Sequence, residues 1–310
     1  MWHCNSIFLN LTNLCNVRCK KCITPRVIRK RGELSKDMLF SVLRLLEANG
    51  FSGLVRCGLG ENLIYSHLDE LFRFLSANTK KFRFDILTNG LAFNVNKEIY
   101  FTNQAVRWGI TLDGMEQDDV EDLQYGLDID RVKNNLFQIR KKFPSCNMYL
   151  NYTLHNKNMQ HLSDFVKMGI TLGVKQLFVT PLKVFENRHT DFLAKYIPDL
   201  TLPSTVSIFS KIKQMAKQNS VKLILPENSC PPAPCSVSGN YSPVIDIDGK
   251  VSFCSGQESV TIGNVKNPDI ASIWEKLRKR TDGGEKLSKF CSNCLTIKNQ
   301  GKTILEMPKL

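Results

Sequence analysis

Short apolar runs alternate with amphipathic segments along the first two-thirds of the chain, and this alternation restricts the fold more than any other feature. Two strands joined through a helix need a right-handed crossover, which places both strands in one parallel sheet. The pattern therefore predicts an α/β fold whose sheet curls into a full or partial barrel. The expected strands lie at residues 7–11, 53–57, 82–88, 106–112, 147–153 and 176–180, and the expected helices lie between the N-cap Ser35 and Asn49 and at residues 67–77, 129–142 and 162–172.

Polar residues follow several predicted strands at the point where each strand ends. Residues 60–61, 88–90 and 111–114 lie at such ends, and a trio of cysteines follows the first strand directly. In parallel sheets, ligands gather at the carboxyl ends of the strands, which meet at one edge. We therefore expect these polar residues to share one rim that binds a ligand.

The alternation stops after residue 180, and a smaller region rich in cysteine follows. The elements expected there are an irregular segment at 181–204, a helix at 206–218, a short strand at 222–225, a hairpin at 242–253 with an Asp-Gly turn, and a helix at 269–280. We therefore expect a barrel core at residues 1–204, a connecting helix and strand at 205–228, and a second domain at 229–310.

Composition bears on where the chain works and what it binds. No run approaches the roughly 18 apolar residues of a membrane span, and the N-terminus lacks the basic region of a signal peptide. We therefore expect a cytoplasmic protein without a membrane partner, in which 11 cysteines favour metal binding or catalysis over disulfides. The net charge of +13 is consistent with an anionic partner, and equally with a basic surface that also lines anionic clusters. Nucleic acid is disfavoured because aromatic and basic residues do not interleave.

Cys15, Cys19 and Cys22 form a C-x3-C-x2-C motif in a loop just after the first predicted strand. A cuboidal iron–sulfur cluster takes four protein thiolates, so three would leave one iron open to a substrate or a cofactor. Basic residues between the cysteines, such as Lys20 and Lys21, are consistent with a site of negative charge. The alternatives for this motif are a zinc knuckle or buried thiols.

The motif, its place after the first strand and the polar strand ends together resemble the radical S-adenosylmethionine superfamily. The resemblance implies a partial (β/α)6 TIM-like barrel, with S-adenosylmethionine bound through its amino and carboxylate groups to the open iron. Two positions depart from the family pattern: Lys21 stands where an aromatic residue is usual, and Leu59 replaces the first glycine of a Gly-Gly-Glu element. By this resemblance, Gly60 and Glu61 contact the methionyl amine, Thr111 and Asp113 contact the ribose, Asn151 contacts the sugar or the carboxylate, and the backbone near Pro181 and Leu182 borders the adenine.

A second cysteine set lies near the C-terminus. Cys235 and Cys254 flank the predicted hairpin, and Cys291 and Cys294 form a C-x2-C motif. Four thiolates make a closed site that suits zinc or a 4Fe-4S cluster. Beside the first motif, this set is similar to the twitch domain, a shortened SPASM domain that holds one auxiliary 4Fe-4S cluster. That resemblance implies two 4Fe-4S clusters in all, the auxiliary one serving electron transfer or electrostatic tuning.

Four further cysteines remain outside both sets. Cys230 lies in a proline-rich loop near the auxiliary site, and it is the candidate donor of a hydrogen atom to a substrate radical; the alternatives are a cluster ligand or an inert thiol. Cys57, at the end of the second strand, is a weaker candidate, and a small buried hydrophobic residue is the alternative there. Cys4 and Cys146 are expected to be structural.

These features favour an oxidoreductase or epimerase that attacks an unactivated C–H bond. Family analogy favours maturation of a ribosomally made peptide, by epimerisation or related chemistry, and a flavodoxin- or ferredoxin-type reductant. Dehydrogenation or epimerisation of an aminoglycoside, aminocyclitol or sugar is the alternative, and the start of the motif at Cys15 is expected to leave no room for a preceding peptide-recognition domain. An alternative of another class is a zinc- or cluster-bearing RNA-binding protein. Neither the substrate nor the oligomeric state follows from the sequence.

Overall fold

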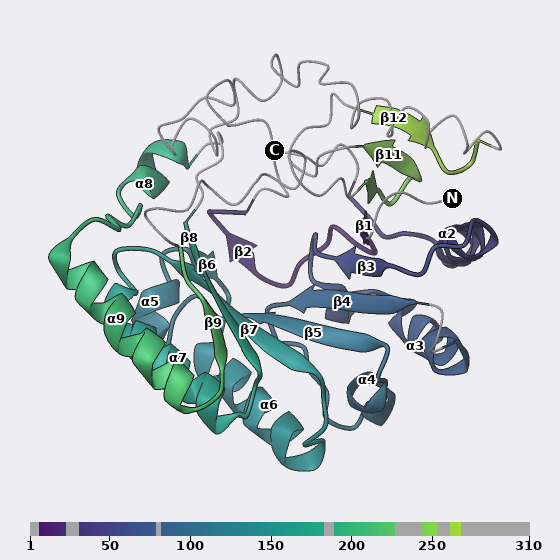
Figure 1. Ribbon diagram of the computed structural model, residues 1–310. Helices are drawn as coiled ribbons and strands as arrows, with labels where there is room; N and C mark the ends of the chain where they lie inside the picture. The colour runs from purple at the N-terminus through teal and green to yellow at the C-terminus, as the bar shows by residue number, and fades with distance from the viewer. Residues whose placement is uncertain are drawn as a thin grey trace, which may run out of the picture.

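The computed structural model describes residues 6–22, 31–78, 82–182, 189–226, 243–252 and 261–267. A ten-stranded main sheet forms the centre of the molecule (Figure 1). Its strands are β1 (Ser6–Leu9), β3 (Leu54–Cys57), β4 (Arg83–Thr88), β5 (Val106–Thr111), β7 (Met148–Leu154), β8 (Gln176–Pro181), β9 (Lys222–Ile224), β10 (Val244–Ile245), β11 (Lys250–Ser252) and β12 (Thr261–Asn264). The strand order is β12-β11-β10-β1-β3-β4-β5-β7-β8-β9. Every neighbouring pair from β10 to β9 is parallel, as the crossover argument predicts.

Helices cover the outer face of this sheet (Figure 1). The helices are α2 (Lys36–Ala48), α3 (Leu68–Ala77), α4 (Glu98–Thr102), α5 (Gln117–Val120), α6 (Ile129–Lys142), α7 (Leu162–Thr171), α8 (Thr190–Ala194) and α9 (Pro203–Gln218), with short 3-10 helices η1 (Asn62–Ile64) and η2 (Met159–His161). None of the helices within the described ranges has both the length and the apolar character that crossing a membrane requires.

The two faces of the sheet differ because successive side chains of a strand point to opposite sides. Ile86 and Trp108 lie opposite each other in register on the outer face, and the Trp108 ring stacks on Phe72 of α3 with centroids 5.7 Å apart. On the inner face, Arg107 Nη2 lies 2.8 Å from a carboxylate oxygen of Asp85. The outer face therefore forms the core, and the interior of the partial barrel carries charge.

The structure confirms the predicted α/β fold class. All six expected strands are present, and α6 has the expected bounds of 129–142. The expected strand at 222–225 is β9, which lengthens the barrel sheet by pairing with β8. Likewise, the hairpin strand β10 pairs in parallel with β1. The main sheet therefore includes strands from all three expected parts of the chain. The division at residues 204 and 228 stays a prediction.

Several short elements differ from the sequence-based expectations. The segment expected to be irregular contains α8, and α9 begins at Pro203, three residues before the expected start. Strand β12 had not been expected, and neither had a small antiparallel sheet of β2 (Arg18–Cys19) and β6 (Gln124–Tyr125). The helix expected at 269–280 lies outside the described residues.

Candidate active site

The loop that carries the first three cysteines leaves β1 at the carboxyl edge of the sheet and is fixed by hydrogen bonds near both ends. Cys15 is exposed, whereas Cys19 and Cys22 are half-buried. The Cys22 amide donates to the Cys19 carbonyl at 3.1 Å, which turns the chain between them. Cys19 lies in β2, opposite Gln124 of β6, whose Nε2 lies 3.7 Å from the Cys19 sulfur.

The thiols of the loop influence one another electrostatically. Burial raises the pKa of the half-buried Cys19 thiol to about 12, and the Cys22 thiolate adds to this rise. At Cys19 the Lys21 ammonium opposes the effect of burial. No three Cys, His, Asp or Glu side chains of the described ranges converge as ligands of a single metal ion would. A cuboidal cluster does not require such convergence, because each thiolate binds a different iron. Three neighbouring thiols on one loop fit that group.

Gly60 makes room for this loop at the end of β3. Its φ is +64°, and a Cβ atom at Gly60 would lie 2.5 Å from the Leu14 carbonyl oxygen and 2.6 Å from that of Thr12. The next amide, that of Glu61, donates to the same Leu14 carbonyl at 2.7 Å. Only glycine combines this backbone conformation with so close an approach, so Gly60 and Glu61 hold the chain just before Cys15.

The Glu61 carboxylate is buried and is satisfied by groups of the protein itself. One oxygen accepts hydrogen bonds from the Thr88 hydroxyl at 2.6 Å and the Leu63 amide at 3.0 Å, and the other accepts from the Asn89 amide at 2.8 Å. Burial raises the pKa of Glu61, and these three donors oppose the rise. Glu61 thus joins the end of β3 to the end of β4, while its contact with a methionyl amine remains a prediction.

Asp113, just beyond β5, is linked directly to the cysteine loop. Its carboxylate forms an ion pair with the Lys21 ammonium, and its other oxygen accepts from the Thr153 amide at 3.0 Å. Beside it, Thr111 of β5 and Asn151 of β7 lie opposite each other in register. The three residues expected to contact ribose or carboxylate are therefore brought together at one rim.

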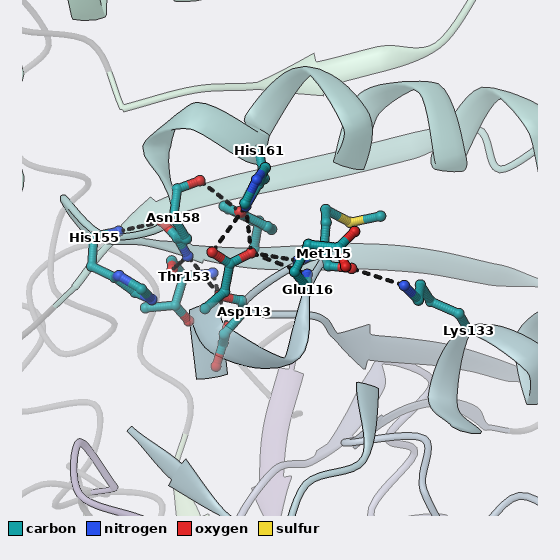
Figure 2. Close-up of polar contacts among 10 residues, drawn as sticks. Asp113, Met115, Glu116, Lys133, Thr153, His155, Asn158 and His161 are labelled. Carbon is teal, nitrogen blue, oxygen red and sulfur yellow. Dashed lines mark hydrogen bonds and ion pairs between the residues drawn. The ribbon is translucent and has the colours of Figure 1, made fainter. Parts of the chain in front are cut away.

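Asn158 fixes the segment after β7 against Asp113 (Figure 2). Its Nδ2 donates to the carbonyls of Asp113 at 2.6 Å and Thr153 at 2.9 Å, and its Oδ1 accepts from the His155 amide at 2.8 Å. A second contact uses His161, whose Nδ1 lies 2.8 Å from a carboxylate oxygen of Asp119. These bonds give Asp113 a rigid surrounding.

The His155 ring is buried beside this network. Neither ring nitrogen has a hydrogen-bond partner among the described residues, although the main chain of Asp113 lies close to the ring. Burial lowers the pKa of His155 to about 4, and the Lys21 ammonium contributes to that decrease. The ring is therefore neutral at physiological pH.

Helix α8 packs onto the same rim from the side of β8. Pro181 ends β8, and the buried Leu182 side chain forms a small apolar cluster with Leu123 and Leu193. Beside this cluster, the Lys20 ammonium lies 4.2 Å from the centre of the Phe192 ring. Leu182, expected near adenine, is thus covered by α8 in this structure.

The remaining expected site residues lie away from this rim or outside the described ranges. Cys57 is fully buried and lies in register with Ile86 on the helix-covered face, so its thiol does not face the barrel interior. This position fits the alternative for Cys57, a small buried hydrophobic residue, and argues against its weaker candidacy as a hydrogen-atom donor. Cys146 is also buried. The cysteines outside the described residues are Cys4, Cys230, Cys235, Cys254, Cys291 and Cys294.

Sequence reasoning missed three residues that organise the site. Lys21 was noted for its charge and for standing where an aromatic residue is usual, but its pairing with Asp113, 92 positions away, has no sequence signal. The contacts of Asn158 and Gln124 depend in the same way on the folded arrangement of loops. Only the position of Asn158, a few residues past a strand end, could have marked it as a rim residue.

Comparison with known families agrees with this site. The radical SAM superfamily model matches residues 9–169, and a model of an iron–sulfur cluster-binding domain, SPASM, matches residues 235–295. The chain belongs to the radical SAM superfamily and carries a C-terminal SPASM domain. It is therefore an enzyme whose cofactors are S-adenosylmethionine and 4Fe-4S clusters. A search of curated protein sequences found no match.

Solved structures share this fold over nearly the whole chain. SuiB of Streptococcus suis bound to S-adenosylmethionine has a TM-score of 0.71 and 14% identity, and the match covers 94% of this chain and 71% of SuiB. The enzyme anSMEcpe bound to S-adenosylmethionine and the Cp18Cys peptide has a TM-score of 0.67 and 18% identity, covering 93% of this chain and 85% of the other. At such identities the likeness establishes the fold.

Proposed function

We propose that this enzyme modifies a ribosomally made peptide by removing hydrogen from an unactivated C–H bond, leading to epimerisation or a related change. The observation that carries the proposal is the cysteine loop, which is fixed at the sheet edge by Gly60, Glu61 and the Lys21–Asp113 ion pair. We assign Cys15, Cys19 and Cys22 as the thiolates that hold the 4Fe-4S cluster.

The positions of the rim residues support the roles that the family resemblance implies. When bound, the cluster and S-adenosylmethionine together supply the radical that removes hydrogen from the substrate. Thr111, Asp113 and Asn151 would orient the sugar and carboxylate of the cofactor, since all three meet where β5 and β7 end. The main chain at Gly60 and Glu61 would receive the methionyl amine, because the Glu61 carboxylate is already used within the protein. The backbone near Pro181 and Leu182 would border the adenine.

A peptide substrate has two lines of support. Both related enzymes named above have been crystallised with peptides, SuiB with its precursor peptide SuiA and anSMEcpe with Cp18Cys. In addition, the interior face carries Arg107, paired with Asp85 and 3.2 Å from the amide oxygen of Gln176. Such a charged surface suits a polar chain better than an apolar ligand.

The C-terminal cysteines would complete the chemistry. We assign Cys235, Cys254, Cys291 and Cys294 to one auxiliary 4Fe-4S cluster and Cys230 to the donation of a hydrogen atom to the substrate radical. After that donation, one electron and one proton would restore the Cys230 thiol, and we propose a flavodoxin- or ferredoxin-type protein as the source of the electron. The auxiliary cluster, when bound, would supply electron transfer or electrostatic tuning. We further propose that the reaction takes place in the cytoplasm.

Mass spectrometry of candidate peptides tests this proposal. Anaerobically reconstituted enzyme is incubated in deuterium oxide with a chemical reductant, S-adenosylmethionine and precursor peptides encoded beside its gene. A thiol-quenched epimerase adds one deuteron to product carbon, and Cys230→Ala abolishes that gain. Loss of two mass units would indicate dehydrogenation. Turnover of aminoglycosides, aminocyclitols or sugars, with every peptide unchanged, would overturn the assignment of the substrate.

A further inference from the structure

Two lysines follow Cys19 in the cysteine loop, and their ammonium groups contact different parts of the protein. The Lys20 ammonium lies over the Phe192 ring, 4.2 Å from its centre. The Lys21 ammonium instead forms an ion pair with Asp113 and remains inside the site, its side chain being only 13% exposed. Lys21 is thus the lysine whose charge faces the end of β5.

The partner of Lys21 is itself held rigidly. Asp113 accepts a hydrogen bond from the Thr153 amide at 3.0 Å, and its carbonyl accepts one from Asn158 at 2.6 Å. The carboxylate is 1% exposed. A cation fixed by such a partner cannot turn out toward solvent, and burial keeps salt from screening its charge. Its position between Cys19 and Cys22 keeps this charge next to two of the cluster thiolates.

We propose that Lys21 holds a positive charge beside the cluster bound by Cys15, Cys19 and Cys22, and that this charge raises the reduction potential of that cluster. This inference rests on the assignment of those three thiolates under the proposed function. Reduction adds one electron from an external donor, and the cluster with its thiolates becomes one unit more negative. The fixed ammonium stabilises the more negative state more than the less negative one. The Asp113 carboxylate acts on Cys19 in the opposite sense but more weakly than Lys21, so it offsets only part of this effect. Reduction by the external donor thereby becomes more favourable.

A redox titration of the full-length, anaerobically reconstituted protein tests this inference. Electron paramagnetic resonance follows the reduced cluster at a series of set potentials. The signal of the first cluster is identified by its absence from a Cys15→Ala/Cys19→Ala/Cys22→Ala variant. Lys21→Met should shift the midpoint of that signal to a more negative potential, and Lys21→Arg, which keeps the charge, should restore the wild-type value. Lys20→Met is the matched control, and its shift should be clearly smaller.

Further variants separate charge from a structural role. Lys21→Gln removes the charge but can still donate a hydrogen bond to Asp113, so it should behave as Lys21→Met does. The inference is overturned if either neutral variant keeps the wild-type midpoint, or if Lys20→Met shifts it equally. It is also overturned if both neutral variants lose the iron of the first cluster, since Lys21 would then be needed for the structure of the loop rather than for its charge. Absence of the first cluster from the wild-type protein would refute the proposed function instead.

Discussion

At Gly60 the backbone has φ +64°, and an added Cβ atom would lie 2.5 Å from the Leu14 carbonyl oxygen. Gly60→Ala should therefore displace the chain before Cys15 and remove the iron of the first cluster, about half of the total. Gly50→Ala is the matched control, since Gly50 has φ +70° but open space around it. This control should cost about 1 kcal/mol of stability and keep all the iron. Iron analysis after reconstitution measures the difference, and equal loss in both variants would argue against the contact.

His155 makes stability depend on pH. Because burial lowers its pKa from 6.5 to about 4, between these values the unfolded chain binds a proton that the folded chain does not. His155 therefore leaves the free energy of unfolding unchanged above pH 6.5. As pH falls from 6.5 toward 4, it lowers this free energy by about 1.4 kcal/mol per pH unit. The charges that face the ring are those of Asp113, Asp119 and Lys21.

His155→Leu should therefore flatten the fall in unfolding temperature between pH 7 and pH 5, measured anaerobically as a difference from wild type. An unchanged slope in His155→Leu would contradict the account of the buried ring.

At the scale of single elements, the segment after β7 depends on Asn158. Truncation by Asn158→Ala removes the hydrogen bonds to the buried Asp113 carbonyl, to the partly buried Thr153 carbonyl and to the His155 amide. We expect a loss of about 3 kcal/mol, together with weaker binding of S-adenosylmethionine because Asp113 loses its support. Calorimetry of unfolding and of cofactor binding measures both effects.

Asn156→Ala provides the comparison for this prediction. Asn156 is exposed, and its Nδ2 donates to the carbonyl of Lys195, the C-cap of α8. Its removal should cost under about 1 kcal/mol. Equal losses in the two variants would show that burial at Asn158 does not matter.

Long periodic elements could be read from the sequence, whereas short ones could not. Helix α6 has a capping Asp128 and an apolar stripe of Val132, Leu136 and Ile139, and its bounds were predicted correctly. Strands β2 and β6 have two residues each, which is too short for any alternation to appear. They form because the cysteine loop meets the segment before α6 in space. The local sequence pattern therefore predicted the strands of the sheet but not the contacts between the loops that join them.

For the whole molecule, the sequence predicted where the site lies better than how it is built. Polar residues at strand ends identify the rim, since parallel strands bring their carboxyl ends to one edge. The ion pair between Lys21 and Asp113 depends on how two distant loops approach each other, and no spacing rule describes that. Cys57 shows the converse, because its position at a strand end did not reveal which face it occupies.

The central claim is that Cys15, Cys19 and Cys22 hold a cluster whose fourth iron receives S-adenosylmethionine. The most direct measurement compares reconstituted wild type with the Cys15→Ala/Cys19→Ala/Cys22→Ala variant for iron content and for 5′-deoxyadenosine formed after reduction. We predict about eight irons per chain in wild type and about four in the variant, with 5′-deoxyadenosine formed only by the wild type. Full iron content in the variant, or 5′-deoxyadenosine formed by it, would contradict this account.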